Sequence, residues 1–237
     1  MKGYVINLDR QPERLTHFYK QSGSEIFERV PAVDRKVLEL IGEKEVFFDT
    51  STFSQFVSRE IAMGEIACTL SHIRCWRKIA TDEKIQEHDF VLIAEDDVIL
   101  LPENSNASSF LKAVKDITHA LKDTPIELVK LQSIFYQKND LFTGSHNITL
   151  KTIKGEATYD SSGSSLYLIR KRLVKNIINR LQTIKPYWLA DDFSHFCAQH
   201  QIVGSSPMLG YVRGDFPSDL EIERQKEREI NPNNISN

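Results

Sequence analysis

The 237-residue sequence has few cysteines, no long apolar stretch and little excess charge. Its three cysteines, Cys68, Cys75 and Cys197, form a sparse and odd-numbered set, which argues against a disulfide framework. No uncharged apolar stretch approaches the roughly 18–20 residues of a membrane-spanning helix, and the first residues lack the apolar core of a secretory signal. The formal net charge of -3 gives no electrostatic reason to expect nucleic acid as a partner. We therefore expect a cytoplasmic globular protein.

The most informative stretch is a run of five apolar residues, 90–94, that leads into three consecutive acids, Glu95, Asp96 and Asp97. The run predicts a strand buried on both faces, with the acids at its carboxyl end, where open α/β sheets bind ligands. Because side chains alternate along extended backbone, we expect Glu95 and Asp97 on one side and Asp96 on the other. Adjoining carboxylates need a positive partner, and a hard divalent cation is the natural one. The alternative is a solvated acidic turn without a ligand.

A second candidate site follows the N-terminal strand that we predict over residues 4–6. Asp9 is expected to cap a helix that runs to about Ser22, with Arg10 and Arg14 on one side of its first turns. A strand end, a helix start and two guanidinium groups together suit a phosphate. The alternative is an ordinary surface helix start.

The residues from Gly64 to Ala80 show the apolar spacing of a buried helix. Cys68, His72 and Cys75 lie on one stripe of it, but three ligands without a fourth do not form a structural zinc site. Buried thiols are the better interpretation.

The remaining pattern alternates predicted strands and helices. Strands are expected over 26–30, 126–131, 148–151 and 166–169, with one more within 201–213; helices are expected over 108–121 and after residue 170. This alternation predicts one α/β domain over 1–215, followed by a charged helix and a disordered tail over 216–237.

Four stretches, in this order, resemble the motifs of glycosyltransferase family 25, the group of bacterial lipooligosaccharide sugar transferases. They cover residues 4–14, 64–72, 95–98 and 163–169. The second and third together are distinctive, and the resemblance spans about residues 3–195. Two features depart from the family pattern. Ser164 and Ser165 stand where the family more often has residues such as threonine and alanine, and the aspartate near position 190 is doubled, as Asp191 and Asp192.

The resemblance implies a GT-A type fold, a Rossmann-like nucleotide-binding sandwich around a mixed central sheet. It also implies transfer of a sugar, with inversion, from a nucleotide-sugar donor, for which UDP-galactose is our expectation, to a lipid-linked oligosaccharide acceptor. Nucleic acid is not an expected partner, and any membrane association is expected to be peripheral, at the inner face. The residues expected to contact the donor are Asn7, Asp9, Arg10, Arg14, Ser71, His72, Glu95 and Asp96.

A divalent cation, Mn²⁺ in preference to Mg²⁺, is expected on Asp97 and Glu95, where it would neutralise the departing diphosphate. Inversion requires a base for the acceptor hydroxyl, and we predict that Asp191 or Asp192 supplies it. Asp191 is the preferred base and Asp192 the preferred start of a helix near Phe193. Two alternative functions remain open: a metal-dependent nucleotidyl- or phosphotransferase, and a non-catalytic subunit that binds a nucleotide-sugar or a glycan.

Overall fold

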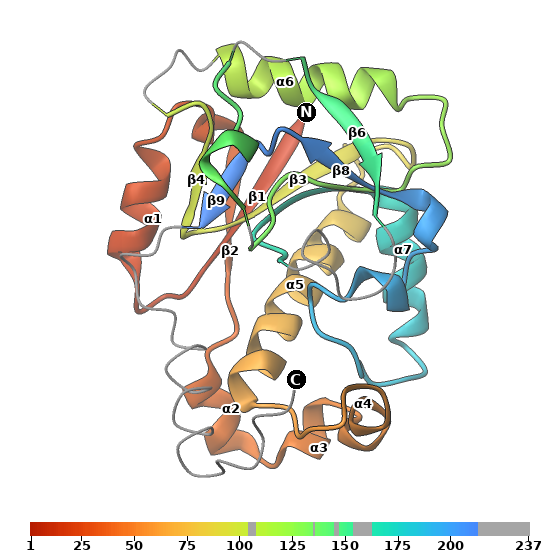
Figure 1. Ribbon diagram of the computed structural model, residues 1–237. Coiled ribbons are helices and arrows are strands. Elements are labelled where there is room, and N and C mark those ends of the chain that lie inside the picture. Colours follow the sequence, from red (N-terminus) through yellow and green to blue (C-terminus); the bar gives the residue numbers. More distant parts are fainter. Residues whose placement is uncertain (104–107, 135, 145–146, 154–162, 213–237) are drawn as a thin grey trace.

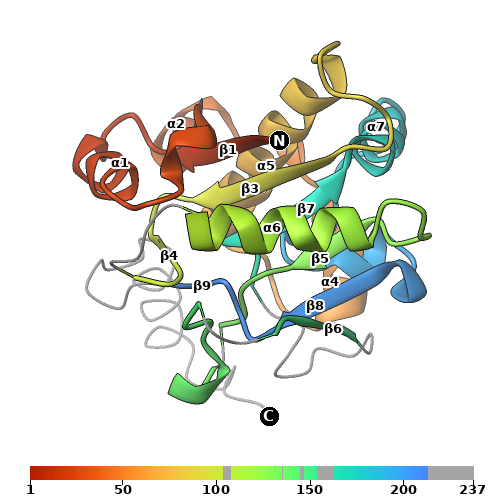
Figure 2. The same ribbon diagram turned by 90° about the horizontal axis from the view of Figure 1, so that it is seen from above.

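The computed structural model describes residues 1–103, 108–134, 136–144, 147–153 and 163–212. Within them, a mixed sheet of seven strands lies between two layers of helices (Figure 1; Figure 2). The predicted α/β class with a mixed central sheet is therefore confirmed. The charged helix and tail predicted over 216–237 lie outside the described residues.

The strands of this sheet lie in the order β2-β1-β3-β7-β5-β8-β6. β1 pairs in parallel with β2 and β3, and β5 pairs in parallel with β8, whereas β7 runs antiparallel to β3 and β5. The carboxyl ends of β1, β3, β5 and β8 therefore meet at one edge of the sheet, together with the amino end of β7. The bounds are β1 (Lys2–Asn7), β2 (Phe27–Pro31), β3 (Phe90–Glu95), β5 (Leu128–Lys130), β6 (Thr149–Thr152), β7 (Leu166–Arg170) and β8 (Ile202–Ser206).

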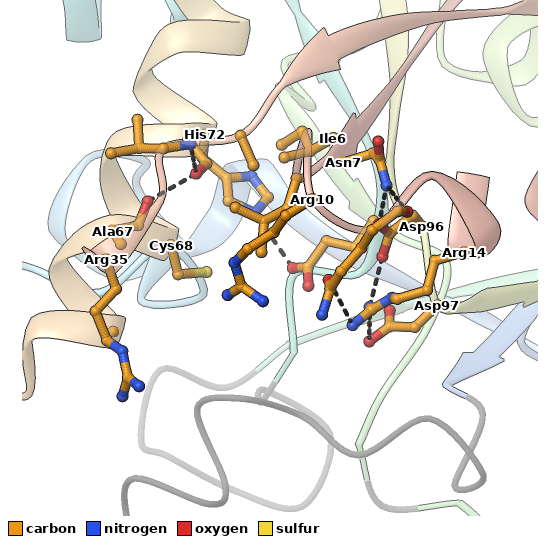
Figure 3. Close-up of a pocket in the computed structure, with 17 residues that line it drawn as sticks. Ile6, Asn7, Arg10, Arg14, Arg35, Ala67, Cys68, His72, Asp96 and Asp97 are labelled. Carbon is orange, nitrogen blue, oxygen red and sulfur yellow. Dashed lines mark hydrogen bonds and ion pairs between the residues drawn. The ribbon is translucent and has the colours of Figure 1, made fainter. Parts of the chain in front are cut away.

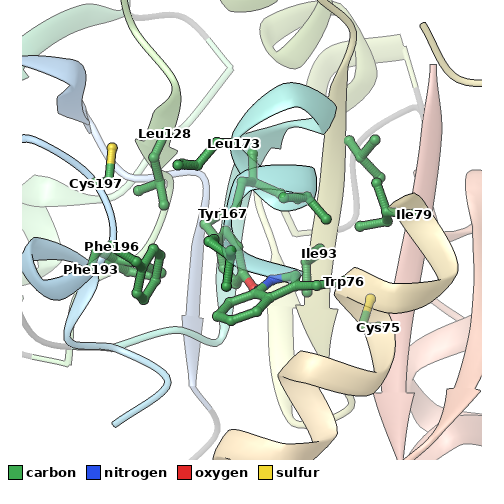
Figure 4. Close-up of a cluster of buried hydrophobic side chains, with 14 of the residues drawn as sticks. Cys75, Trp76, Ile79, Ile93, Leu128, Tyr167, Leu173, Phe193, Phe196 and Cys197 are labelled. Atoms are coloured by element: carbon green, nitrogen blue, oxygen red, sulfur yellow. The ribbon is translucent and has the colours of Figure 1, made fainter. Parts of the chain in front are cut away.

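Alternating side chains of the sheet contribute to two hydrophobic clusters, one on each face, and a third cluster lies among the residues 38–67. In β1, Tyr4 and Ile6 belong to one cluster, and Val5 belongs to the other. The first cluster includes side chains from α5 (Met63–Thr81) and α7 (Lys171–Arg180), and part of it is drawn in Figure 4. The second includes side chains from α1 (Pro12–Tyr19) and α6 (Ser108–Ala120). Strands covered on both faces are necessarily apolar throughout, which explains the unbroken run before Glu95.

The segment 35–60, whose sequence indicates no clear element, forms short helices. Asp34 and Asp49 precede two of them, and each side-chain oxygen accepts a backbone N–H of the first turn, as helix caps do. Beyond the central sheet, β4 and β9 pair with each other in a separate two-stranded sheet. The bounds are α2 (Arg35–Ile41), α3 (Lys44–Phe47), α4 (Thr50–Val57), β4 (Val98–Leu100) and β9 (Gly210–Val212).

The first helix differs from the prediction. It begins at Pro12 rather than after Asp9, because proline suits the first turn, where its missing N–H has no partner to lose. Asp9 does not cap it, and its carboxylate pairs with Arg29 instead. Arg10 precedes the helix, so the predicted placement of Arg10 and Arg14 on one helical side is wrong.

Other boundaries shift by a few residues. The helix after residue 170 ends at Arg180 instead of reaching Pro186, and the segment 201–213 contributes to two strands, β8 and β9, rather than one. Within the part of the chain that is described, no helix combines the length and apolar character that crossing a bilayer requires.

Candidate functional site

A cavity of about 180 Å³ opens at the carboxyl ends of β1 and β3, beside the first half of α5 (Figure 3). We refer to it as the β1–β3 cavity. It brings together most of the residues predicted to contact a donor or a metal. Those that line it are Asn7, Arg10, Arg14, Ser71, His72, Glu95, Asp96 and Asp97, and Asp9 is not among them.

The acidic turn of this cavity is held by one guanidinium group. Arg14 Nη2 lies 2.5 Å from Asp96 Oδ1 and 2.9 Å from Asp97 Oδ2. Asn7 Nδ2 donates to the other Asp96 oxygen at 2.6 Å. Arg14 is therefore a positive partner built into the chain for these acids, as adjoining buried carboxylates require.

The predicted alternation of the three acids is wrong. β3 ends at Glu95, and Asp96 and Asp97 form the turn toward β4. Because the backbone is no longer extended there, Asp96 and Asp97 both meet Arg14. Glu95 points instead toward His72 and Ser164, at 3.3 Å and 3.2 Å. The three carboxylates thus have two different sets of partners: Arg14 pairs with Asp96 and Asp97, and His72 and Ser164 contact Glu95.

Asp97 combines burial with incomplete pairing. Burial, and then the negative charge of Glu95, raise the pKa of Asp97 to about 7, although Arg14 opposes the shift. Asp97 Oδ1 is buried and has no hydrogen-bond partner among the described residues. A buried carboxylate oxygen without a partner is costly. It fits a hard divalent cation, which prefers such oxygens.

Glu95 is oriented by a buried chain of hydrogen bonds. Trp76 Nε1 donates to Tyr167 Oη at 3.0 Å, Tyr167 Oη lies 2.9 Å from His72 Nδ1, and His72 Nε2 lies 3.3 Å from Glu95 Oε1. Trp76 and Tyr167 are fully buried, and His72 is 1% exposed. Burial raises the pKa of Glu95, but the hydrogen bonds from His72 and Ser164 together with nearby positive charge, including that of Arg14, outweigh it, and the pKa is lowered.

The number of available hydrogens indicates which atoms donate and which accept in this series of hydrogen bonds. The Tyr167 oxygen already accepts from Trp76, and His72 Nδ1 is the one acceptor within reach of its own O–H among the described residues. Nδ1 must then accept, so the neutral ring carries its hydrogen on Nε2 and donates it to Glu95. His72 is thus a positioning residue for Glu95.

The same assignment of donors and acceptors argues against a metal centre at His72. Cys68, His72 and Glu95 place one ligand atom each within 4.8 Å of one another, the single such group of three in the described residues. A metal on His72 Nε2 would move the hydrogen to Nδ1 and leave the Tyr167 O–H without an acceptor. We therefore do not assign a metal to this group. Cys68 also corrects the prediction of a buried thiol, since it is partly exposed and lines the β1–β3 cavity.

Replacing Tyr167 by phenylalanine is expected to lower the free energy of unfolding by about 1–3 kcal/mol, because Trp76 Nε1 and His72 Nδ1 would lose a buried partner. Chemical denaturation measures the loss. Tyr19→Phe is the matched control, since Tyr19 is an exposed residue whose hydroxyl donates to the Phe27 carbonyl oxygen at 3.3 Å, and it should change stability by less than about 0.5 kcal/mol. Equal losses of unfolding free energy in the two variants would contradict the buried series of hydrogen bonds through Tyr167.

Two predicted donor contacts have other partners. The Ser71 hydroxyl donates to the Ala67 carbonyl oxygen at 2.7 Å and accepts from Val33 N at 2.8 Å, so it fastens the segment after β2 to α5. Arg10 Nε donates to Asp34 Oδ2 at 2.7 Å while the residue still lines the cavity.

Sequence reasoning missed residues that line this cavity or contact its lining, among them Arg35, Ser164 and Tyr167. Arg35 lines it, yet it lies in a segment without a clear pattern. Ser164 and Tyr167 reach Glu95 and His72 from β7 and the residues before it. Residues 163–169 resembled a family motif, which was the available signal, but it indicated no role for either side chain.

The two candidate bases lie outside this cavity, beyond the amino end of β7. Asp191 Oδ2 accepts from Gly163 N at 3.4 Å. Asp192 precedes a short 3-10 helix, Phe193–His195, as predicted, but its side chain caps no backbone N–H. Instead it accepts from Ser194 Oγ at 3.0 Å and lies 2.9 Å from His195 Nε2. Asp192 is therefore the more heavily engaged of the two carboxylates.

Comparison with known proteins gives a consistent result. The model of glycosyltransferase family 25, described as an LPS biosynthesis protein family, matches residues 1–194. A putative glycosyltransferase from Haemophilus influenzae is 26% identical over 212 residues, covering 86% of this chain and 67% of that protein. A lipooligosaccharide biosynthesis protein from the same species, lic2B, is 24% identical over 237 residues, covering 95% of this chain and 82% of that protein.

Insect proteins match a shorter region. A glycosyltransferase 25 family member from Drosophila pseudoobscura pseudoobscura is 33% identical over 120 residues, which make up 48% of this chain. Those residues are 18% of the insect protein, so the chain spans less than a fifth of the length of this relative.

Proposed function

Because the chain belongs to glycosyltransferase family 25, we propose that it transfers a sugar from a UDP-sugar to the glycan of a lipooligosaccharide or related acceptor, with inversion at the sugar carbon. Galactose is the sugar we propose, by family resemblance. The proposal includes a GT-A type fold, which the mixed sheet between two helical layers supports. It also places the protein in the cytoplasm, at the inner face of the membrane, where a lipid-linked acceptor would be reached.

The observation that carries the proposal is the pairing of opposite charges in the β1–β3 cavity. Arg10, Arg14 and Arg35 line it together with the carboxylates of the turn after β3. Guanidinium groups match the oxygens of a diphosphate in geometry and charge. Asn7 adds an amide at the end of β1, although it already contacts Asp96, Gln11 and Arg29. The cavity therefore suits the diphosphate and ribose of a nucleotide-sugar.

A divalent cation, Mn²⁺ in our proposal, fits the same cavity. Asp97, through its unpartnered Oδ1, and Glu95 would hold it, whereas both oxygens of Asp96 already pair with Asn7 and Arg14. Such an ion stabilises the charge on a departing diphosphate as a Lewis acid. The hydrogen bond from His72 is one of the contacts that favour the ionised form of Glu95, and it orients the carboxylate.

In this proposal, Asp191 is the base that acts on the acceptor. Its carboxylate would take the proton from the acceptor hydroxyl as that oxygen attacks the sugar carbon and UDP departs. Asp191 contacts Gly163 N, and the next residue, Ser164, contacts Glu95. The proposed base and the proposed donor site are thus connected through two consecutive residues.

The proposal predicts that the protein releases UDP from UDP-galactose in the presence of Mn²⁺ and that EDTA abolishes the release. Chromatography of the nucleotide products measures this directly. Release of UMP or pyrophosphate instead would mean chemistry at phosphorus and would favour the phosphotransferase alternative. Tight binding of UDP without turnover of any nucleotide-sugar would favour a binding subunit.

A further inference from the structure

A second cavity, of about 110 Å³, lies at the carboxyl ends of β5 and β8. We refer to it as the β5–β8 cavity. β3, β5 and β8 point in the same direction (Figure 1). The β5–β8 cavity therefore lies on the same edge of the sheet as the β1–β3 cavity. Its lining residues come mainly from β5, β6, β8 and the residues that follow them. The polar ones are Lys130, Gln132, Ser133, Asp140, Lys151, Thr152, Ser205 and Ser206.

The segment Gly163–Ser164 connects the two cavities. Gly163 has φ +101°, and a Cβ at this position would lie 2.8 Å from Gln132 Oε1. Only glycine permits this backbone conformation at so short a distance from the amide. Ser164 contacts Glu95 on the other side, and Gly163 N contacts Asp191. Gly163 therefore links the β5–β8 cavity, through Gln132, to the proposed base, Asp191.

Two buried side chains of this cavity have unused hydrogen-bonding groups. Gln132 is 2% exposed, and neither its Oε1 nor its Nε2 has a partner among the described residues. Ser205 is 7% exposed, and its hydroxyl also has no partner there. Buried polar groups are normally hydrogen-bonded, because an unmade bond is costly. A ligand that both donates and accepts hydrogen bonds would satisfy them.

Sugar hydroxyls meet this requirement. A glutamine amide presents an acceptor oxygen and a donor nitrogen side by side, and neighbouring hydroxyls of a pyranose can each donate to or accept from them. Ser205 offers a third contact of the same kind. Among the described residues, the lining of the β5–β8 cavity includes no arginine, and its cationic side chains are Lys130 and Lys151, whereas three arginines line the β1–β3 cavity; it therefore offers a diphosphate no guanidinium group.

We propose that the β5–β8 cavity binds a pyranose ring of the acceptor, with the Gln132 amide hydrogen-bonded to two neighbouring hydroxyls. This inference rests on the proposed function, since it assigns the acceptor to a place beside Asp191. It separates the two substrates along the sheet edge: the donor occupies the ends of β1 and β3, and the acceptor occupies the ends of β5 and β8.

The test uses Gln132→Met, which nearly preserves volume and removes both amide groups. Methyl β-D-glucopyranoside and methyl β-D-galactopyranoside are titrated into the ¹⁵N-labelled protein, and the side-chain amide signal of Gln132 is assigned by its absence in the variant. We expect a saturable shift of this signal in the wild type. Binding is compared between the two proteins through their backbone amide signals, and it should be about tenfold weaker or more in the variant, because a hydrogen-bonded pair is lost. The variant should also melt at a higher temperature, since an unpartnered buried amide is gone.

Thr69→Val is the matched control. Thr69 is fully buried in α5, its hydroxyl has no partner among the described residues, and it lines neither cavity. It should raise the melting temperature without affecting pyranoside binding. The inference is overturned if the pyranosides leave the Gln132 signal unmoved, if Gln132→Met binds them as the wild type does, or if inorganic phosphate shifts the signal and the pyranosides do not. The titration needs no turnover, so a failure of UDP-galactose hydrolysis alone would count against the proposed function and not against this site.

Discussion

Replacing Asp97 by asparagine is expected to reduce Mn²⁺-dependent sugar transfer by about a hundredfold or more while leaving the fold intact. Asparagine keeps an oxygen that can accept from Arg14, but it removes the charge that we propose holds the cation. Turnover of UDP-galactose measures the first effect, and circular dichroism checks the fold. Asp116→Asn, a surface change on α6, is the control and should behave as the wild type does.

The same variant should change how the stability of the metal-free protein depends on pH. The folded-state pKa of Asp97, about 7, lies above the value of about 4 expected in the unfolded chain. The folded state therefore holds a proton that the unfolded state releases, and the stability contributed by Asp97 is present below about pH 4 and lost as the pH rises to about 7. Asp97→Asn should remove this part of the decline. Thermal melts between pH 4 and 8 in EDTA measure it, and parallel wild-type and variant curves would rule out the raised pKa.

Asp191→Asn is expected to reduce transfer by about a hundredfold or more, because the amide cannot accept the proton of the acceptor hydroxyl. Binding of UDP and the melting temperature should remain close to those of the wild type, since Asp191 makes one long hydrogen bond, to Gly163 N. Transfer assays with calorimetric titration of UDP separate the two effects.

Asp192→Asn is the control variant with which the turnover and stability of Asp191→Asn are compared. Asp192 pairs with His195 and accepts from Ser194, so its loss should lower stability more than turnover. Near wild-type transfer in both variants would place the base in another segment. A loss of turnover confined to Asp192→Asn would exchange the roles assigned to the two residues.

The sequence predicted those parts of the molecule that depend on local pattern. The apolar run before Glu95 indicated β3, and the helical spacing after Gly64 indicated α5, because burial imposes a periodicity on each. Most of the residues predicted to contact a donor or a metal also line the β1–β3 cavity, since strand ends and neighbouring charges can be recognised in the sequence.

The partners of the site residues could not be predicted, because they depend on contacts between distant segments. The sequence suggested a metal as the positive partner of the acids, whereas Arg14 pairs with two of them. The hydrogen-bond chain through Tyr167 and the unused amide of Gln132 likewise depend on the strand order, in which β7 lies between β3 and β5. No local spacing encodes that order.

The hydrogen bonds of the site also determine when it can form during folding. Asn7 bonds to Asp96 across 89 positions of the chain, His72 to Tyr167 across 95, and Gly163 to Asp191 across 28. Each of these contacts closes a long loop, whose entropy must be lost before the contact contributes. A nascent chain that has emerged only as far as β3 therefore lacks the group that orients His72. Competence to bind and react arises late, when the second half of the sheet has joined the first.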